Sequence, residues 1–186
     1  MTLFPPLYIL MKIDLNNLKW VLLCITLSIT SCKTGPNPKE RLEVVTYGQF
    51  DEFVKETGYI TDAEKFGWSI VQTDKLPVTQ VSYNDAIAYC EWSGSRLPTY
   101  AEYWRLINGD DRKVMTEQNG PISAVTKVNI LGNVWEITST TKSGNIRLAG
   151  GSIFCSPNTC HGTIKERELY VDKQTGNIHI GFAVIK

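Results

Sequence analysis

The stretch that decides the fold reads Val81-Ser-Tyr-Asn-Asp-Ala-Ile-Ala-Tyr-Cys-Glu-Trp92, followed after a short gap by Arg96-Leu-Pro-Thr99. Ser82 and Asp85 approximate a capping box, in which the side chain of each residue accepts a hydrogen bond from the backbone N–H of the other. Gly94 follows the apolar positions as a helix stop signal. The stretch therefore predicts a helix that starts at Ser82 and ends before Gly94.

Two more helices are predicted from the same kinds of signal. Thr99 and Glu102 make a complete capping-box pattern for a helix that ends at Asn108-Gly109. Thr46 precedes a stretch over residues 47–56 whose apolar side chains share one face. We therefore expect the first half of the folded part to be mainly helical.

The second half of the chain changes character after residue 110, where short segments with β-branched residues alternate with turn residues. Residues 168–173 and 178–185, joined across residues 174–177, predict a β-hairpin. Helices followed by strands indicate an α+β domain, compact and with little regular secondary structure.

The N-terminal segment is typical of a secretory signal. Lys12 and Lys19 precede the uncharged, mostly apolar stretch of residues 20–29, which is short for a membrane-spanning helix. The stretch ends in Ile29-Thr-Ser-Cys32, which resembles the lipobox of bacterial lipoproteins, where cleavage precedes a cysteine that then receives a diacylglycerol. The alternatives are a transmembrane anchor or a cysteine placed there by chance.

These features divide the chain into three parts. We expect a signal peptide over residues 1–31, the lipidated Cys32 with a linker to residue 42, and one folded domain over residues 43–186. The predicted location is the bacterial cell envelope, anchored by lipid at the outer membrane or the periplasmic face. The 19 basic and 19 acidic residues balance, so no net charge attracts nucleic acid.

Three cysteines are expected to remain in the folded domain, because Cys24 leaves with the signal peptide and Cys32 is lipidated. Cys90 lies on the apolar face of its predicted helix and is expected in the core. Cys155 and Cys160 can meet if the chain turns at Pro157-Asn158. From spacing alone this pair is a structural disulfide, a metal site or a reactive pair.

Several chemistries lack their usual residues. The two histidines, His161 and His179, show no spacing typical of a zinc hydrolase, and each is interpreted as an ordinary surface or hairpin residue. A zinc site built from Cys155, Cys160 and His161 with one more ligand remains an alternative. The glycine-rich run at residues 149–152 is followed by neither lysine nor helix, so it is no phosphate-binding loop.

Four segments taken together resemble the formylglycine-generating enzyme family, also called sulfatase-modifying factors, whose fold is related to that of C-type lectins. They are residues 45–67, 77–103 with Arg96-Leu-Pro-Thr99, 129–138 reading Asn-Ile-Leu-Gly-Asn-Val-Trp-Glu-Ile-Thr, and 150–160 reading Gly-Gly-Ser-Ile-Phe-Cys-Ser-Pro-Asn-Thr-Cys. Their order is the order of the family, and Gly181-Phe182 matches its C-terminal end. The resemblance implies a compact fold of the formylglycine-generating type.

The third segment matches a calcium-binding loop of that family. The resemblance implies a structural calcium ion held by the Asn129 side chain, the main-chain carbonyls of Gly132 and Val134, and the Glu136 carboxylate. Such hard oxygen donors suit Ca²⁺. The alternative is that Asn129 caps a turn and Glu136 is a solvated strand residue.

The fourth segment matches the catalytic centre of the family, which oxidises a cysteine of a sulfatase to formylglycine. The resemblance implies copper held by Cys155 and Cys160, with Ser152 and Trp135 at positions that line the pocket. Two thiolates are soft ligands that favour copper(I). A disulfide between the two cysteines is the alternative.

The implied function is therefore copper-dependent oxidation of a cysteine in a protein or peptide substrate, such as a sulfatase. Departures from the family are a shortened chain at residues 71–76 and 109–129, changed residues at 156–159, and Ala183 where arginine is usual. They leave a second hypothesis, a non-catalytic envelope lipoprotein that binds a protein or glycan partner. An iron-dependent sulfoxide synthase of the same fold needs several histidine ligands that the chain lacks.

Overall fold

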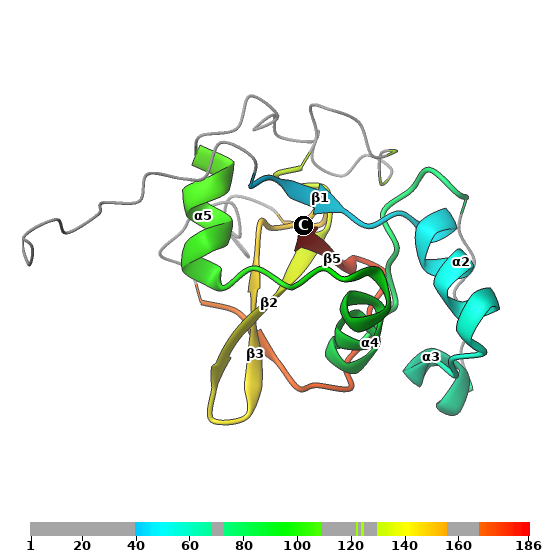
Figure 1. The fold of residues 1–186 in the computed structure, drawn as a ribbon. Helices are drawn as coiled ribbons and strands as arrows, with labels where there is room; N and C mark the ends of the chain where they lie inside the picture. Colours follow the sequence, from blue (N-terminus) through cyan, green and yellow to red (C-terminus); the bar gives the residue numbers. More distant parts are fainter. Residues whose placement is uncertain (1–39, 68–72, 109–121, 123, 125–129, 156–167) are drawn as a thin grey trace, which may run out of the picture. The chain divides into compact units, whose positions relative to one another are not determined.

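The computed structural model describes residues 40–67, 73–108, 122, 124, 130–155 and 168–186 (Figure 1). These residues belong to one compact unit, which spans residues 38–186. The predicted signal peptide with Cys32, the calcium ligand Asn129 and the copper ligand Cys160 lie outside the described residues. No helix in the described ranges is long and apolar enough to cross a membrane.

The three predicted helices are confirmed, with bounds close to those expected. They are α2 (Tyr47–Thr57), α4 (Tyr83–Ser93) and α5 (Tyr100–Asn108), and a short helix α3 (Asp62–Lys65) lies between the first two. Reciprocal capping boxes begin α2, with Thr46 and Gln49, and α4, with Ser82 and Asp85. At the start of α5, Thr99 N–H donates to Glu102 at 2.8 Å and Glu102 N–H donates to Thr99 Oγ1 at 3.2 Å.

A five-stranded sheet has the order β1-β5-β2-β3-β4. Its strands are β1 (Leu42–Val44), β2 (Trp135–Lys142), β3 (Asn145–Ala149), β4 (Tyr170–Val171) and β5 (Ile180–Ile185). Strand β5 pairs antiparallel with β1 and parallel with β2. Helices combined with one mixed sheet confirm the predicted α+β class.

The predicted hairpin between residues 168–173 and 178–185 is wrong. Strand β4 pairs with β3 at one edge of the sheet, whereas β5 lies between β1 and β2. All six residues of β5 are buried, so its backbone needs partners on both sides, and a two-residue hairpin partner does not supply them. The turn signals at residues 174–177 mark a connection across the sheet.

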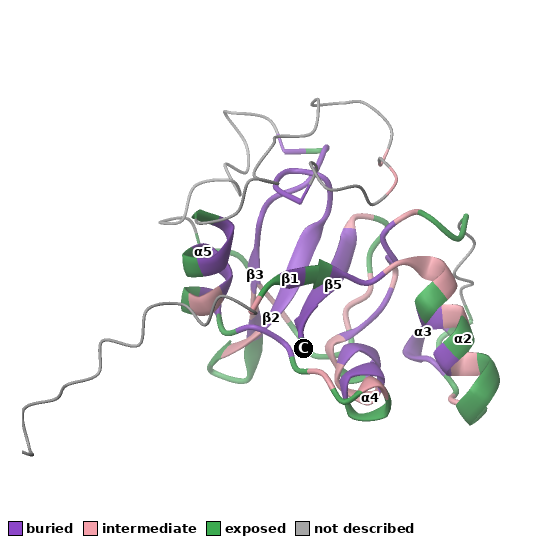
Figure 2. Cartoon of the chain, turned by 45° about the horizontal axis from the view of Figure 1, so that its top comes forward, coloured by how far each residue is buried: buried purple, intermediate pink, exposed green. Residues whose placement is uncertain are grey.

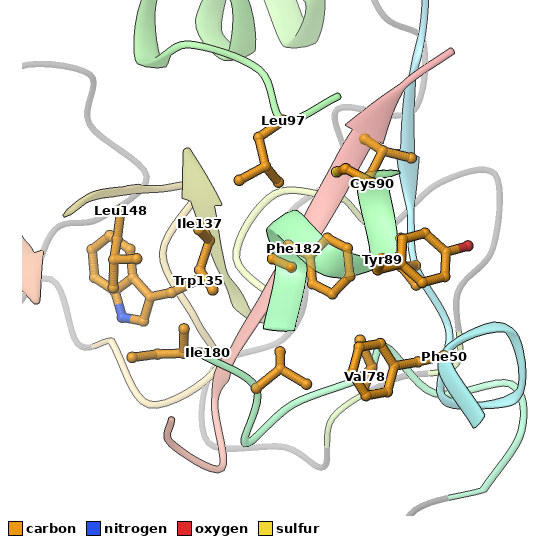
Figure 3. Close-up of a cluster of buried hydrophobic side chains, with 14 of the residues drawn as sticks. Phe50, Val78, Tyr89, Cys90, Leu97, Trp135, Ile137, Leu148, Ile180 and Phe182 are labelled. Atoms are coloured by element: carbon orange, nitrogen blue, oxygen red, sulfur yellow. The ribbon is translucent and has the colours of Figure 1, made fainter. Parts of the chain in front are cut away.

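Successive side chains of a strand point to opposite faces of its sheet, and every residue of β5 is buried. Both faces of the sheet are therefore covered at β5 (Figure 2). Phe182 belongs to the cluster with Phe50 of α2 and Tyr89 of α4, and Cys90 lies in this cluster as predicted (Figure 3). Ala183 belongs to the second cluster, which is built mainly from α5. Helices α2 and α4 therefore cover one face and α5 the other.

A buried carboxylate fastens α3 to the start of α4. Asp62 accepts hydrogen bonds from Ser82 Oγ at 2.6 Å, Asn84 Nδ2 at 3.2 Å and Lys65 Nζ at 2.9 Å. In return, Asp62 N–H donates to the Asp85 carboxylate at 3.0 Å. Every oxygen of the Asp62 carboxylate thus has a partner, as a buried charge requires.

Gly150 allows the backbone to pass directly beside the side chains of Glu136 and Tyr103. Its φ angle is +85°, and a Cβ at this position would overlap Glu136 Oε2 and the Tyr103 hydroxyl. Gly144 has nearly the same φ, +84°, but a Cβ there has open space around it. A comparison of substitutions at the two glycines therefore separates the cost of the left-handed φ angle from the cost of steric overlap.

We expect Asp62→Ala to lower the free energy of unfolding by about 2–4 kcal/mol at pH 7, because Ser82 Oγ then loses its buried partner. Burial raises the pKa of Asp62, but the hydrogen bonds from Ser82, Lys65 and Asn84 outweigh it and hold the pKa below its usual value. The stabilisation is therefore present above about pH 4 and disappears as the pH falls through the lowered pKa. Urea titrations at pH 7 and pH 3 measure both effects.

Asp51→Ala, which removes a carboxylate on α2 that pairs with exposed Lys55, serves as the control and should change stability by under about 0.5 kcal/mol. An equal loss in both variants would contradict the assignment.

We expect Gly150→Ala to be far more destabilising than Gly144→Ala. A left-handed φ costs a non-glycine residue about 1–2 kcal/mol, and both variants carry this cost. Only the Gly150 variant adds overlap with Glu136 and Tyr103, so its loss should exceed that of the control by about 2 kcal/mol or more. Thermal unfolding of the two variants checks the difference, and similar melting temperatures would refute it.

Candidate functional site

Three segments distant in the sequence meet at one end of the parallel strand pair. Backbone hydrogen bonds join them: Gly132 N–H to Gly150 O at 2.9 Å, Ile153 N–H to Asn133 O at 3.2 Å, and Trp135 N–H to His179 O at 2.8 Å. The loop before β2, the turn after β3 and the residue before β5 are thus held together. This junction carries Ser152, Trp135 and Cys155, the three described members of the predicted catalytic set.

Ser152 and Cys155 form a tight turn around the sulfur atom. Cys155 N–H donates to Ser152 O at 2.9 Å, while Ser152 N–H donates to Cys155 Sγ at 3.3 Å. Ser152 Oγ lies 3.8 Å from the same sulfur. Both residues are buried. The turn thus directs a backbone donor at the Cys155 sulfur and holds the Ser152 hydroxyl close to it.

Cys155 is disulfide-bonded in this structure. Of the two predicted copper ligands, only Cys155 is among the described residues, so the structure does not describe the pair as a whole. Cys90 is a free, buried cysteine, and burial raises the pKa of its thiol. A neutral buried thiol is a poor nucleophile, which agrees with the predicted structural role of Cys90.

Trp135 opens β2 and is buried in the same apolar cluster as Cys155. Figure 3 shows its indole with the side chains of Ile137, Leu148 and Ile180. Trp135 and Cys155 thus both belong to the apolar interior, where side chains are shielded from water.

Glu136 is fully buried, so the alternative of a solvated strand residue is wrong. The Tyr103 hydroxyl donates to Glu136 Oε2 at 3.2 Å, whereas Oε1 has no hydrogen-bond partner among the described residues. Burial raises the pKa of this carboxyl well above its usual value, and the hydrogen bond from Tyr103 only partly opposes it. An unsatisfied buried oxygen of this kind fits a hard cation such as Ca²⁺.

The remaining predicted calcium ligands are only partly described. Gly132 and Val134 lie in the loop that leads into β2, next to Glu136 in the sequence, and Asn129 lies outside the described residues. The described ranges contain no group of three or more histidine, cysteine, aspartate or glutamate side chains that would hold a metal ion. A calcium site here would therefore depend on main-chain carbonyls as well as on Glu136.

Sequence reasoning missed two residues at this junction, Phe154 and His179. Their ring centroids lie 5.4 Å apart, and 49% of the Phe154 surface is exposed. Phe154 could have been identified as a site residue from its position directly before Cys155. His179 had none, because only the parallel register of β5 with β2 brings it to the site.

Comparison with known proteins matches part of this chain to one protein family. Residues 42–119 match the model of the sulfatase-modifying factor enzyme 1-like domain. The formylglycine-generating enzyme of Thermomonospora curvata is 36% identical over 100 residues, an alignment that covers 32% of this chain and 33% of that protein. The enzyme of the same name from Mus musculus is 34% identical over 101 residues, covering 32% and 27%. These alignments thus span about a third or less of the curated relatives.

One longer match is to a protein named as inactive. The inactive C-alpha-formylglycine-generating enzyme 2 of Mus musculus is 28% identical over 172 residues, covering 52% of this chain and 56% of that protein.

Two solved structures share the fold at low sequence identity. CarF matches with a TM-score of 0.51 and 17% identity, covering 80% of this chain and 84% of that chain. Treponema denticola variable protein 1 matches with a TM-score of 0.55 and 16% identity, covering 76% and 81%. The resemblance predicted from the four segments is confirmed: residues 42–119 match the sulfatase-modifying factor enzyme 1-like domain, and about a third of the chain is similar to formylglycine-generating enzymes.

Proposed function

We propose that this chain is a copper-dependent oxidoreductase of the formylglycine-generating type, which oxidises a cysteine of a protein substrate to formylglycine. The observation that carries the proposal is the turn at Ser152 and Cys155, in which the serine N–H donates to the cysteine sulfur beside the buried Trp135. The substrate class follows from the names of the relatives, and a sulfatase is the proposed example.

Copper(I) would be held by the thiolates of Cys155 and Cys160, and when bound it would supply the redox chemistry that transfers electrons from the substrate to oxygen. The donor set fits, because two thiolates are soft ligands. The chain's own residues supply the surroundings. Ser152 directs its N–H at the Cys155 sulfur, and the apolar cluster around Trp135 keeps water from it.

The overall reaction defines what the site must accommodate. The C–S bond of the substrate cysteine is broken, a C=O bond forms at the same carbon, and the sulfur leaves as hydrogen sulfide. This change removes two electrons and two protons from the cysteine and adds the oxygen atom of one water. Molecular oxygen is the proposed oxidant, and its reduction to water takes two further electrons from a thiol reductant.

We propose a structural calcium ion at the loop before β2, held by Glu136, the carbonyls of Gly132 and Val134, and the Asn129 side chain. The unsatisfied Glu136 Oε1 supports it. A bound cation would also remove the main cost of burying this carboxylate, since a charge in an apolar interior needs a partner.

We further propose that the domain is attached to the bacterial cell envelope through a lipid on Cys32, at the outer membrane or the periplasmic face. The support is the signal-like sequence of residues 1–31 with its lipobox-like end. The envelope is an oxidising compartment, which agrees with a disulfide at Cys155.

A second candidate function is non-catalytic binding of a protein or glycan partner at the envelope. The disulfide at Cys155 favours it, because an oxidised sulfur cannot bind copper(I). The similarity to a relative that is named as inactive also supports this candidate.

The two functions separate in an assay of the reduced protein. Loaded with copper(I), the wild type should convert the cysteine of a sulfatase-derived peptide to the aldehyde, as seen in the peptide mass. Cys155→Ser should lower the conversion rate by about a hundredfold or more, because one of two ligands is lost. Cys90→Ala, which removes the free core cysteine, should retain the rate and is the matched control.

Copper(I) affinity measured against a competing chelator completes this test. Equal affinity of wild type and Cys155→Ser would reject the enzyme hypothesis and favour the binding protein. Tight copper binding without conversion of the peptide would reject the proposed substrate class.

Glu136→Gln tests the calcium proposal through stability. Millimolar Ca²⁺ should raise the melting temperature of the chelator-treated wild type but leave the variant unchanged. Without calcium, wild-type stability should fall as the pH rises above about 4.3, since the raised pKa of Glu136 means that the folded state holds its proton more tightly than the unfolded state. Glu136→Gln should lack this dependence of stability on pH.

Glu43→Gln, at an exposed carboxylate of β1 that pairs with Lys186, is the control and should keep the calcium response. A response in both variants would rule out Glu136 as a ligand.

A further inference from the structure

Phe154 and His179 form an aromatic pair at the rim of the Cys155 site. Their rings lie 5.4 Å apart at an interplanar angle of 58°. Phe154 is half-exposed and directly precedes Cys155, and Ile178, next to His179, is also largely exposed. Large apolar side chains of this kind are costly to leave in water, and they gather here beside the candidate site.

The residues of the site itself hold both rings in place. Phe154 N–H donates to Ser152 Oγ at 3.3 Å, and the His179 carbonyl accepts from Trp135 N–H at 2.8 Å. Ser152 and Trp135 are both buried, so the backbone that supports the pair is fixed. The aromatic pair is therefore continuous with the site.

A peptide whose cysteine reaches the Cys155 region comes close to Phe154. Neighbouring Cα atoms are about 3.8 Å apart, so the Phe154 side chain starts within one residue of Cys155. An extended peptide advances about 3.3 Å per residue, which places the residues up to about three positions from its cysteine within reach of the Phe154 ring.

The two rings favour an uncharged substrate side chain over a charged one. Burial lowers the pKa of His179, which keeps its imidazole neutral at neutral pH. None of the ion pairs between described residues involves His179, so the described part of the chain gives it no charged partner there. An apolar side chain placed on the two rings covers exposed carbon, whereas a charged one loses hydration without gaining a partner.

We propose that Phe154 and His179 form a specificity-determining subsite, which binds an uncharged, apolar or aromatic side chain of the substrate within about three residues of the reacting cysteine. This subsite rests on the proposed function, because it takes the cysteine-bearing peptide as its occupant. It adds to that function a selection among cysteine peptides that the residues between Cys155 and Cys160 do not account for.

Fluorescence anisotropy with labelled peptides tests the subsite on the full-length protein. Each peptide carries serine in place of its cysteine, so that binding needs neither copper nor a redox step. Leucine or aspartate is placed in turn at each position flanking the serine. For at least one position, wild type should bind the leucine peptide about tenfold more tightly than the aspartate peptide.

Phe154→Ala should reduce this preference to about twofold or less, with the affinity for the aspartate peptide nearly unchanged. Phe154→Leu, which keeps an apolar side chain, should restore most of it. Phe66→Ala removes an equally exposed phenylalanine from the end of α3 and should keep the wild-type preference. Melting temperatures of all variants verify that they are folded.

The proposal is overturned if wild type shows no preference, if no peptide binds, or if Phe66→Ala and Phe154→Ala behave alike. Failure of the enzyme proposal gives a different result, since the leucine preference would persist in a protein that forms no aldehyde. Conversely, aldehyde formation at equal rates from leucine and aspartate peptides, in wild type and in Phe154→Ala, would refute the subsite alone.

Discussion

The hydrogen bond from Trp135 N–H to the His179 carbonyl, 2.8 Å long, starts the parallel pairing of β2 with β5, and the rest of the domain depends on that pairing. It places β5, the last of the described strands, inside the sheet between β1 and β2, where both of its faces are covered. Phe182 then completes the core against α2 and α4, while Ala183 meets the cluster under α5. Gly181, directly before Phe182, leaves room for the Val78 carbonyl, which a side chain would displace. One register thus fixes the core, the approach of the helices and the position of His179 at the site.

Features set by neighbours in the sequence were predictable, and features set by this pairing were not. The helix starts at Thr46, Ser82 and Thr99 follow from side chains three residues apart. The parallel pairing joins segments that are some forty-five residues apart, and it leaves no local pattern. The hairpin prediction failed for this reason, because turn residues at 174–177 indicate a reversal but do not say which strand is the partner. Only the resemblance to a family, through the order of its four segments, gave non-local information.

The burial of Glu136 could not be predicted from alternation either. In a strand with one solvated face, a glutamate between Trp135 and Ile137 would point to water, but β2 is covered on both sides. The protein treats two of its buried carboxylates, those of Asp62 and Glu136, differently. Asp62 receives donors on both oxygens, and its pKa stays low, as expected for an ion with a structural role. Glu136 receives one donor from Tyr103 and keeps one oxygen unsatisfied. The contrast within one domain supports the proposal of a bound cation at Glu136 and a purely structural role for Asp62.

The stability of the site and its choice of substrate depend on different atoms. Main-chain atoms make the contacts between its three segments: Gly132 to Gly150, Ile153 to Asn133, and Trp135 to His179. Such contacts persist when side chains change, so the junction tolerates substitution at Phe154 and His179 without loss of the turn around Cys155. The main-chain contacts of the junction are therefore compatible with different side chains around Cys155. On this scaffold, the exposed aromatic pair determines which peptides approach Cys155, whether the sulfur then acts as a copper ligand or stays in a disulfide.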